Sequence, residues 1–321
     1  MLSFLNLKQS KGNFFKDTDG NVVLDMNCPL PLGYNHDVLI NARDSNVYDR
    51  FLQGSVDASF VPPQDYVDIL CDDVMPVAPQ GLDQLQLSDG NSTAANEAAL
   101  TAAIMEYAIR NNKSDISDLS VLGFSRAAHG CTVATLSCSD PAANAGNAPT
   151  YDWPIADSPT IKYPYSKNEH ANIEEEERCY ESAVQQINER RSAGKDVAAI
   201  IVEPISSLEM HAATPNFFKK LRNLAKTEGI PFIVDETKSG MGQTGKMWGH
   251  ELWFLQDRDG GCPDFVTFGG KAGISGFFAT YNMRQGYAHC GSQEQNLDMT
   301  KVLTFGITWR HMQYMNMLEL V

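Results

Sequence analysis

Apolar and polar residues follow two different periods along this chain, and the two periods separate helices from strands. In residues 215–228 four apolar side chains fall on one helical face, and Gly229 follows as a stop signal. Short continuous apolar runs are instead typical of strands that are buried on both faces. Such runs occupy residues 197–202, 231–234 and 265–268. The central part of the chain therefore predicts strands that alternate with helices.

Residues upstream continue the same order. Apolar residues recur at helical spacing in residues 180–187, which predicts a helix. The acidic run Glu174–Glu177 suits the N-terminal half of this helix, and Gly194 ends it. Ala-rich residues 94–110 predict another helix, because alanine is the strongest helix former. Further strands are expected at residues 82–87 and 119–124, and a β-hairpin turn at residues 16–21.

Strands that alternate with helices imply right-handed crossovers and a mostly parallel sheet. In such sheets ligands bind outside the carboxyl ends of the strands. Three of the expected strands run directly into residues that carry chemistry, which are Glu203, Asp235 and Lys271. We therefore expect an α/β fold in which these three side chains share one edge of the sheet.

The charge of the chain narrows the choice of partners. Its 321 residues include 25 basic and 40 acidic ones, for a net charge of −15. That negative field repels phosphate backbones and anionic lipids, so neither nucleic acid nor a membrane surface is expected as a partner. No apolar run approaches the ~18 residues that cross a bilayer, and the first residues lack a signal-peptide pattern. We expect an intracellular protein.

Cysteine and histidine spacing argues against a metal centre. The 7 cysteines include no Cys-x-x-Cys pair, so neither a disulfide framework nor a cysteine-bound metal cluster is expected. His250-Glu251 lacks the second histidine that a zinc protease helix requires. No metal is expected.

A lysine after two glycines, together with an aspartate at a neighbouring strand end, is the arrangement that pyridoxal phosphate needs. Lys271 supplies an amine for the cofactor aldehyde, and a buried Asp235 keeps the pyridine nitrogen protonated. Gly90, Asn91, Ser92 and Thr93 precede the helix 94–110, and the N-terminus of a helix binds phosphate well. An isolated Lys271 would otherwise be interpreted as a solvated surface residue.

The segment Gly240–Lys246 resembles two other phosphate-binding motifs. It matches the dinucleotide fingerprint G-x-G-x-x-G and the first seven positions of a P-loop. However, Met247 stands where a P-loop has Ser or Thr for magnesium. The first glycine also does not directly follow a strand, as the dinucleotide motif requires. Neither motif is therefore expected to function here.

At these residues and others, the chain resembles the 4-aminobutyrate group of class III aminotransferases, which are fold-type I pyridoxal-phosphate enzymes. The similarity runs from about Phe4 to about Trp309, and its most specific segment is Asp152–Ala156. Other shared segments are Lys162–Pro164, Val202–Ile205, Val234–Glu236, Thr244–Lys246 and Thr267–Phe268.

The resemblance implies an activity and an architecture. The expected activity is transfer of the amino group of 4-aminobutyrate to 2-oxoglutarate, by a homodimer that carries pyridoxal 5'-phosphate. Residues 46–321 would form a three-layer α/β/α large domain. Residues 1–45 would belong to a small domain whose C-terminal part this chain lacks. By family likeness the protein is mitochondrial or cytoplasmic.

The resemblance also implies residue roles. Lys271 corresponds to the Schiff-base lysine, Asp235 to the partner of the pyridine nitrogen, and residues 90–93 to the phosphate loop. Thr308 corresponds to the threonine that reaches the phosphate of the neighbouring subunit. The remaining candidates are His129 beside the ring, Lys238 in place of a glutamine near the phenolic oxygen, and Glu203 and Glu209 for the substrate. Alternatively, His129 is a packed or surface histidine, and Glu203 caps a strand or faces solvent.

Two departures from the family fall in the expected pocket. Ala128 stands where the family has an aromatic residue that stacks on the cofactor, and Cys131 where it has an arginine. Arginine binds a substrate carboxylate through two parallel hydrogen bonds, which cysteine cannot do. The alternative function is therefore a catalytically degenerate relative that keeps the fold, with or without the cofactor.

Overall fold

The computed structural model describes residues 4–26, 33–42, 68, 70–88, 91–253, 261–269, 274–284 and 302–304. The chain divides into two compact units. One contains the described residues up to Pro76 together with Ile274, and the other contains Val77–Gly269 and the described residues between Ser275 and Thr304. The second unit, called the large unit below, carries the site.

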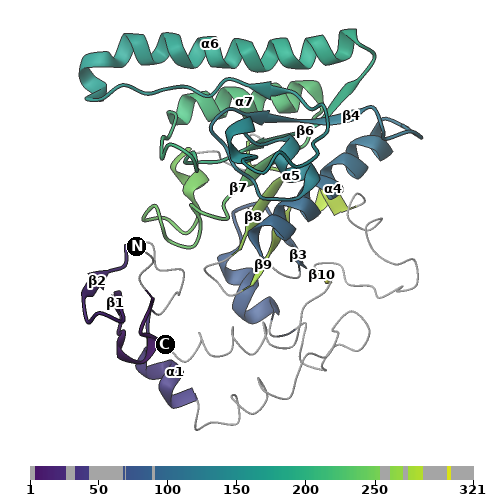
Figure 1. The fold of residues 1–321 in the computed structure, drawn as a ribbon. Coiled ribbons are helices and arrows are strands. Elements are labelled where there is room, and N and C mark those ends of the chain that lie inside the picture. Colours follow the sequence, from purple (N-terminus) through teal and green to yellow (C-terminus); the bar gives the residue numbers. More distant parts are fainter. Residues whose placement is uncertain are drawn as a thin grey trace. The chain divides into compact units, whose positions relative to one another are not determined.

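Eight strands of the described residues form one sheet in the large unit (Figure 1). Their order is β10-β3-β9-β8-β7-β6-β4-β5. All neighbouring pairs are parallel except the two that involve β9, which runs antiparallel to β3 and β8. The strands are β3 (Gln84–Ser88), β4 (Leu119–Phe124), β5 (Ile155–Ala156), β6 (Asp196–Val202), β7 (Phe232–Asp235), β8 (Phe265–Phe268), β9 (Ser275–Ala279) and β10 (Val302–Thr304).

Helices lie on both sides of this sheet, so the large unit is a three-layer α/β/α structure. Figure 1 shows α6 and α7 together on one side, whereas α4 lies on the other. The helices are α4 (Ser92–Arg110), α5 (Val133–Ser137), α6 (Tyr165–Ser192) and α7 (Pro215–Glu228). Short 3-10 turns are η3 (Met75–Val77), η4 (Pro141–Ala143), η5 (Gly249–Trp253) and η7 (Tyr281–Met283).

The core of the large unit lies between α4 and the sheet. Small residues of α4, such as Ala99 and Ala103, pack against Ile201, Ile233 and Phe265 from three neighbouring strands, and all five are fully buried. Because alanine side chains are short, the helix approaches the sheet closely. The first turn of α4 is thereby held near the carboxyl ends of β6 and β7.

Local sequence signals account for the ends of the helices. Asn91 caps α4 by accepting a hydrogen bond from the backbone N–H of Ala94 at 3.3 Å. Pro215 begins α7, where its missing N–H costs nothing. Gly229 ends α7 in the left-handed conformation, with φ of 67°, which glycine adopts without a steric penalty.

Most of the predicted elements are confirmed. The helix 215–228 and the strands 119–124 and 265–268 have the predicted bounds, and the other predicted strands differ by one or two residues at an end. Helix α6 begins at Tyr165, well before the acidic run. The sequence did not predict these first turns, because they are polar and show no apolar period. Strand β9 was not predicted, since its sequence SGFFA is short and contains a glycine.

The N-terminal unit is described by itself. Strands β1 (Phe14–Lys16) and β2 (Val22–Leu24) form the predicted antiparallel hairpin. Asp17 Oδ1 accepts the backbone N–H groups of Asp19 at 3.0 Å and Asn21 at 2.8 Å, which closes the turn. The other elements are η1 (Leu7–Gln9), α1 (Asp37–Ala42) and the π turn η2 (Leu70–Val74).

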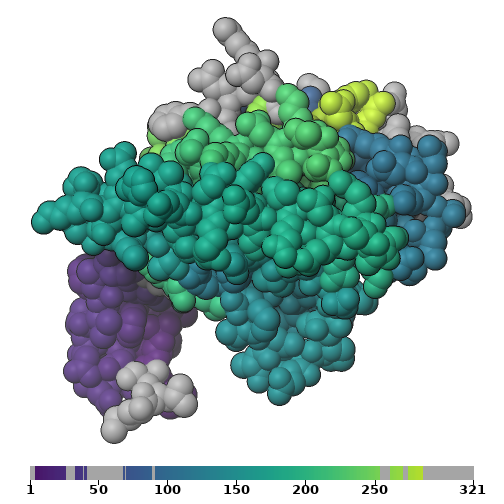
Figure 2. Space-filling model, turned by 90° about the horizontal axis from the view of Figure 1, so that it is seen from above, coloured from purple at the N-terminus to yellow at the C-terminus, as the bar shows by residue number. Residues whose placement is uncertain are grey.

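Helix α6 lies along an exposed face of the large unit. Figure 2 shows it in teal, with the green α7 beside it. Lys220 of α7 pairs with Glu177 of α6 and lies 5.8 Å from the centre of the Tyr180 ring. Among the described residues, none of the helices combines the length and apolarity that a membrane span would need.

Candidate active site

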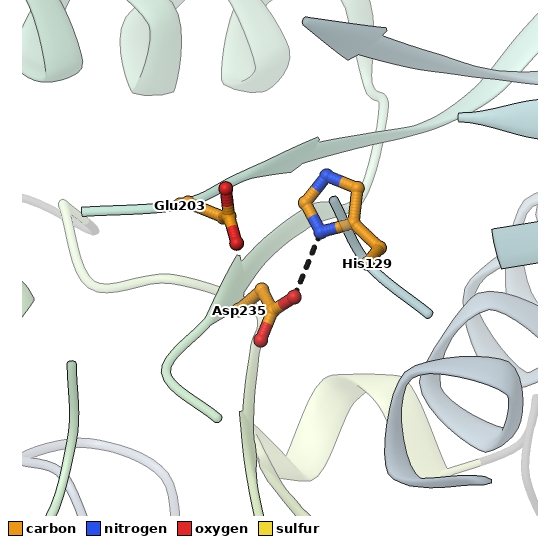
Figure 3. Close-up of side chains that lie close together, drawn as sticks. All are labelled: His129, Glu203 and Asp235. Atoms are coloured by element: carbon orange, nitrogen blue, oxygen red, sulfur yellow. Dashed lines mark hydrogen bonds and ion pairs between the residues drawn. The ribbon is translucent and has the colours of Figure 1, made fainter. Parts of the chain in front are cut away.

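Three buried side chains meet at the carboxyl edge of the parallel strands (Figure 3). Glu203 directly follows β6, Asp235 is the last residue of β7, and His129 lies in the loop after β4. Ligand atoms of all three lie within 4.8 Å of one another. Of the three residues predicted to share this edge, Glu203 and Asp235 lie together as expected, and His129 joins them from a loop. The surface alternatives for His129 and Glu203 are wrong, since the residues are 1% and 8% exposed.

Asp235 accepts four short hydrogen bonds. Its Oδ1 accepts the backbone N–H of Thr237 at 3.0 Å and the Thr237 hydroxyl at 2.6 Å. Its Oδ2 accepts the carboxamide of Asn96 at 2.7 Å and Nδ1–H of His129 at 2.8 Å. The carboxylate is therefore fixed by donors from the end of its own strand, from α4 and from the His129 loop.

These donors determine the protonation state of Asp235. Burial by itself would raise its pKa, but the hydrogen bond and the charge of His129, together with the bonds from Thr237, lower the pKa below its ordinary value. Asp235 is thus an anion inside the protein at neutral pH. This is the state that a protonated pyridine nitrogen requires of its partner.

Asn96 joins the parts of this network. Its Nδ2 also donates to the carbonyl oxygen of His129 at 2.7 Å, and its Oδ1 accepts the hydroxyl of Thr267 at 2.6 Å. The His129 backbone N–H in turn donates to Ser139 Oγ at 2.9 Å. Nε2 of His129 is buried and finds no hydrogen-bond partner among the residues that the structure describes.

Glu203 is held by a second set of donors. Its Oε2 accepts the backbone N–H of Ser207 at 2.9 Å and that of Ala128 at 3.3 Å, and its Oε1 accepts the Ser207 hydroxyl. Burial raises the pKa of Glu203, His129 opposes that increase, and Asp235 adds to it. The pKa values of the two buried carboxyl groups are therefore shifted in opposite directions: that of Asp235 is lowered and that of Glu203 is raised.

Lys238 is directed toward Glu203. Its ammonium group lies 3.7 Å from Glu203 Oε1 and donates to the carbonyl oxygen of Ala128 at 3.2 Å and to the Ser207 hydroxyl. The side chain is 53% exposed. The Lys238 ammonium group therefore lies at the rim of the site.

The expected phosphate loop lies at the first turn of α4. Asn91, Ser92 and Thr93 stand there, and a cavity of about 560 Å³ is lined by Asn91, Thr93, Glu97, Cys131 and Thr132 among others. Thr93 Oγ1 lies 3.8 Å from Cys131 Sγ. A Cβ atom at Gly269 would lie 3.0 Å from Ser92 Cα, so the chain after β8 passes close to this turn.

Other predicted site residues are not part of this cluster. Glu209 is half-exposed and pairs instead with Arg126 at 3.6 Å and with His211 at 3.9 Å. Lys271, Gly90 and Thr308 lie outside the described residues. Gly240–Lys246 forms turns with no α-helix after it and Lys246 is exposed, as the rejection of both glycine motifs anticipated.

The residues present fit pyridoxal phosphate. A buried anion, Asp235, accepts a hydrogen bond from Asn96, which lies about one turn along α4 from Ser92 and Thr93. The N-terminus of that helix attracts phosphate. His129, Glu203 and Asp235 also have the composition of a cation site. However, both oxygens of each carboxylate already accept hydrogen bonds from protein donors, so we assign no metal to them.

Several members of the network were not identified from the sequence. Asn96, Thr237, Thr267 and Ser207 are ordinary polar residues in a helix, a turn, a strand and a loop. Asn96 alone gave a signal, because a carboxamide on the apolar face of an Ala-rich helix must find a partner when it is buried. The others depend on which strand ends become neighbours.

Comparison with known proteins agrees with this geometry. The model of the family described as aminotransferase class-III matches residues 1–288. The 4-aminobutyrate aminotransferase of Dictyostelium discoideum is 35% identical over 303 residues, which are 88% of this chain and 60% of that protein. The mitochondrial 4-aminobutyrate aminotransferase of Homo sapiens is 34% identical over 298 residues, 86% of this chain and 58% of that protein. The chain thus spans about three fifths of the length of these relatives.

Solved structures share the fold. The lysine aminotransferase of M. tuberculosis has a TM-score of 0.79 at 23% identity, and the match covers 100% of this chain and 72% of that one. A transaminase of the marine bacterium Virgibacillus has a TM-score of 0.76 at 17% identity, covering 99% of this chain and 67% of that one. At such identities the likeness concerns the fold alone. With the family match over most of its length and a buried anionic strand-end site, this chain belongs to the class III aminotransferases.

Proposed function

We propose that this chain acts in a pyridoxal-phosphate-dependent aminotransferase. The observation that carries the proposal is Asp235, a buried carboxylate at the end of β7 whose pKa is lowered by His129 and Thr237 against the effect of burial. Asp235 would hold the ring nitrogen, Asn91, Ser92 and Thr93 the phosphate, and Lys271 the aldehyde carbon. When bound, the cofactor supplies an electron-withdrawing ring that stabilises negative charge on the substrate carbon.

The residues of the chain have distinct tasks in this proposal. Asp235 stays anionic and keeps the ring nitrogen protonated, and His129 and Asn96 keep the Asp235 carboxylate in place. Lys271 would supply the amine that takes up and returns the proton of the substrate carbon. Thr308 of a second copy would contact the phosphate, which makes the active form a homodimer.

We propose 4-aminobutyrate as the amino donor and 2-oxoglutarate as the acceptor. The relatives of 32–35% identity that carry the name 4-aminobutyrate aminotransferase support this choice. The mammalian ones are named mitochondrial, which supports a mitochondrial location. Residues 1–45 would serve as part of a small domain, and residues 46–321 as the cofactor-binding large domain.

A specific observation also favours a second candidate, a relative that binds the cofactor without turnover. Ala128 offers no ring to stack on the cofactor, and Cys131 is exposed and has no cationic group that could bind a substrate carboxylate. Lys238 is paired with Glu203. The described residues therefore support cofactor binding better than they support substrate binding.

One experiment separates these candidates. The full chain is incubated with pyridoxal phosphate, reduced with borohydride, and digested for mass spectrometry, which is expected to find the cofactor on Lys271. Glutamate formation from 4-aminobutyrate and 2-oxoglutarate is then measured. Cofactor on Lys271 with glutamate formed supports the aminotransferase, whereas cofactor on Lys271 without glutamate supports the second candidate. Cofactor on another lysine contradicts both.

A further inference from the structure

The starting point is the number of hydrogen bonds that Asp235 already accepts. An ionised carboxylate has about four lone-pair positions. Four short donors fill them, which are the N–H and the hydroxyl of Thr237 on Oδ1 and the groups of Asn96 and His129 on Oδ2. Thr267 lies 3.4 Å from Oδ1, but its one hydroxyl proton is directed to Asn96 Oδ1 at 2.6 Å.

A fifth donor on Asp235 therefore has to displace one of the four. Three of them are fixed by their covalent surroundings. The Thr237 N–H belongs to the backbone. The Asn96 carboxamide is planar and is also held by the His129 carbonyl and the Thr267 hydroxyl. The His129 N–H lies in a planar, fully buried ring, so its proton cannot turn away without moving the ring. The Thr237 hydroxyl differs, because its proton reorients by rotation about one bond.

We propose that the hydroxyl of Thr237 is an internal substitute for the ring nitrogen of the cofactor. It occupies a lone pair of Asp235 Oδ1 in the free protein and gives up that position when the ring N–H arrives. Thr237 is thus a positioning residue, which acts through Asp235 and sets the affinity for the cofactor. This inference rests on the proposed function, because it takes the ring nitrogen to bind Asp235.

The energetic consequence follows from the exchange of one hydrogen bond for another. In the natural chain, the gain from the ring N–H is reduced by the loss of the hydroxyl bond. In Thr237→Val the side chain keeps its shape, but a lone pair of Asp235 is free before the cofactor binds. A net hydrogen bond changes an equilibrium by roughly five-fold, so this variant is expected to bind pyridoxal phosphate about five-fold more tightly.

The test compares three chains and two ligands. Dissociation constants for pyridoxal phosphate and for its benzene analogue, which has carbon in place of the ring nitrogen, are measured by fluorescence for the natural chain, Thr237→Val and Thr237→Ser. Thr237→Ser keeps the hydroxyl and is expected to bind like the natural chain. The analogue has no ring N–H, so its affinity is expected to be the same for all three.

Melting temperatures of the cofactor-free chains give a second readout. Thr237→Val is expected to melt lower than the natural chain, because Asp235 loses a donor, while its cofactor affinity rises. A purely structural role for Thr237 would lower the melting temperature without raising the affinity. Thr237→Ala removes the same hydroxyl with less bulk and replaces Thr237→Val if the latter does not fold.

The possible outcomes are distinguishable. Equal or weaker binding of pyridoxal phosphate by Thr237→Val overturns this inference and leaves the proposed function intact. A five-fold gain for the benzene analogue as well overturns it too, because the effect then does not involve the ring nitrogen. If the natural chain binds no pyridoxal phosphate, the proposed function itself fails, and the inference fails with it.

Discussion

His129 donates Nδ1–H to Asp235 Oδ2 at 2.8 Å, and both side chains are buried. This bond joins the loop after β4 to the end of β7, across 106 positions of the sequence. It is the largest single contribution that lowers the pKa of Asp235 against burial. The charge of the site therefore depends on a contact between two separate segments of the chain.

Replacing this histidine is expected to make stability depend on pH in a defined way. Because the pKa of Asp235 is lowered on folding, its anion stabilises the folded chain above the unfolded pKa of about 3.9, and this contribution is lost as the pH falls through the folded pKa. His129→Ala removes most of that contribution, so we expect it to lose about 2 kcal/mol of unfolding free energy at pH 7 and less below pH 4.

Urea unfolding at several pH values provides the measurement for His129→Ala. His170 of α6 is almost fully exposed, so His170→Ala serves as the matched control and is expected to change stability little at any pH. A loss in His129→Ala that stays constant from pH 7 to pH 3 would show that the histidine acts only by packing.

Asn96 is expected to be the most sensitive neutral residue of the site. Its carboxamide satisfies Asp235, the His129 carbonyl and the Thr267 hydroxyl, and it is 1% exposed. Asn96→Ala leaves all three groups without this partner, so we expect a loss of about 3 kcal/mol in the free energy of unfolding. Asn188→Ala on the exposed side of α6 is the control, with an expected change within about 0.5 kcal/mol. Equal effects of the two substitutions would contradict the network.

Glu203 is expected to show the opposite pH dependence from Asp235. Burial raises its pKa, so the folded chain binds the Glu203 proton more tightly than the unfolded chain does. Stability is therefore lost as the pH rises from the unfolded value of about 4.3 through the folded pKa. Glu203→Gln carries no charge, so its melting temperature relative to the natural chain is expected to increase with pH across that window. Glu181→Gln on the exposed surface of α6 should show no such trend.

Two ion pairs that involve α7, one buried and one exposed, test how burial changes the contribution of an ion pair to stability. Arg222 binds Asp264 through two bonds of 2.9 and 3.1 Å and also donates to the Cys262 carbonyl at 2.8 Å, all of them buried. Arg222→Met leaves the Asp264 carboxylate buried without its cation, and we expect a loss of about 4 kcal/mol.

The matched variant is Lys220→Met, on the same helix. Lys220 and its partner Glu177 are both about half-exposed, so we expect Lys220→Met to lose no more than about 1 kcal/mol of unfolding free energy. The measurement for both variants is guanidinium unfolding monitored by circular dichroism. Similar losses for Arg222→Met and Lys220→Met would contradict the assignment of the first pair to the core.

Much of the fold was predictable because its signals are local. Helix α7 carries its apolar face, its initial proline and its terminal Gly229 within fifteen consecutive residues. Strands β4 and β8 are short apolar runs between polar loops, which is the pattern of a strand buried on both faces. Strand β9 gave no such signal, because its antiparallel place between β3 and β8 depends on pairing partners distant in the sequence.

The sequence by itself determined the parallel α/β order and the strand-end positions of Glu203 and Asp235, because apolar period and strand order are set by neighbouring residues. Lys271, the third strand-end residue that it predicted, lies outside the described residues. Only the tertiary structure decided which donors Asp235 receives. Asn96, His129 and Thr237 reach its two oxygens from a helix, a loop and a turn. Hydrogen bonds of that kind depend on distances between segments that fold together, and no local pattern encodes them.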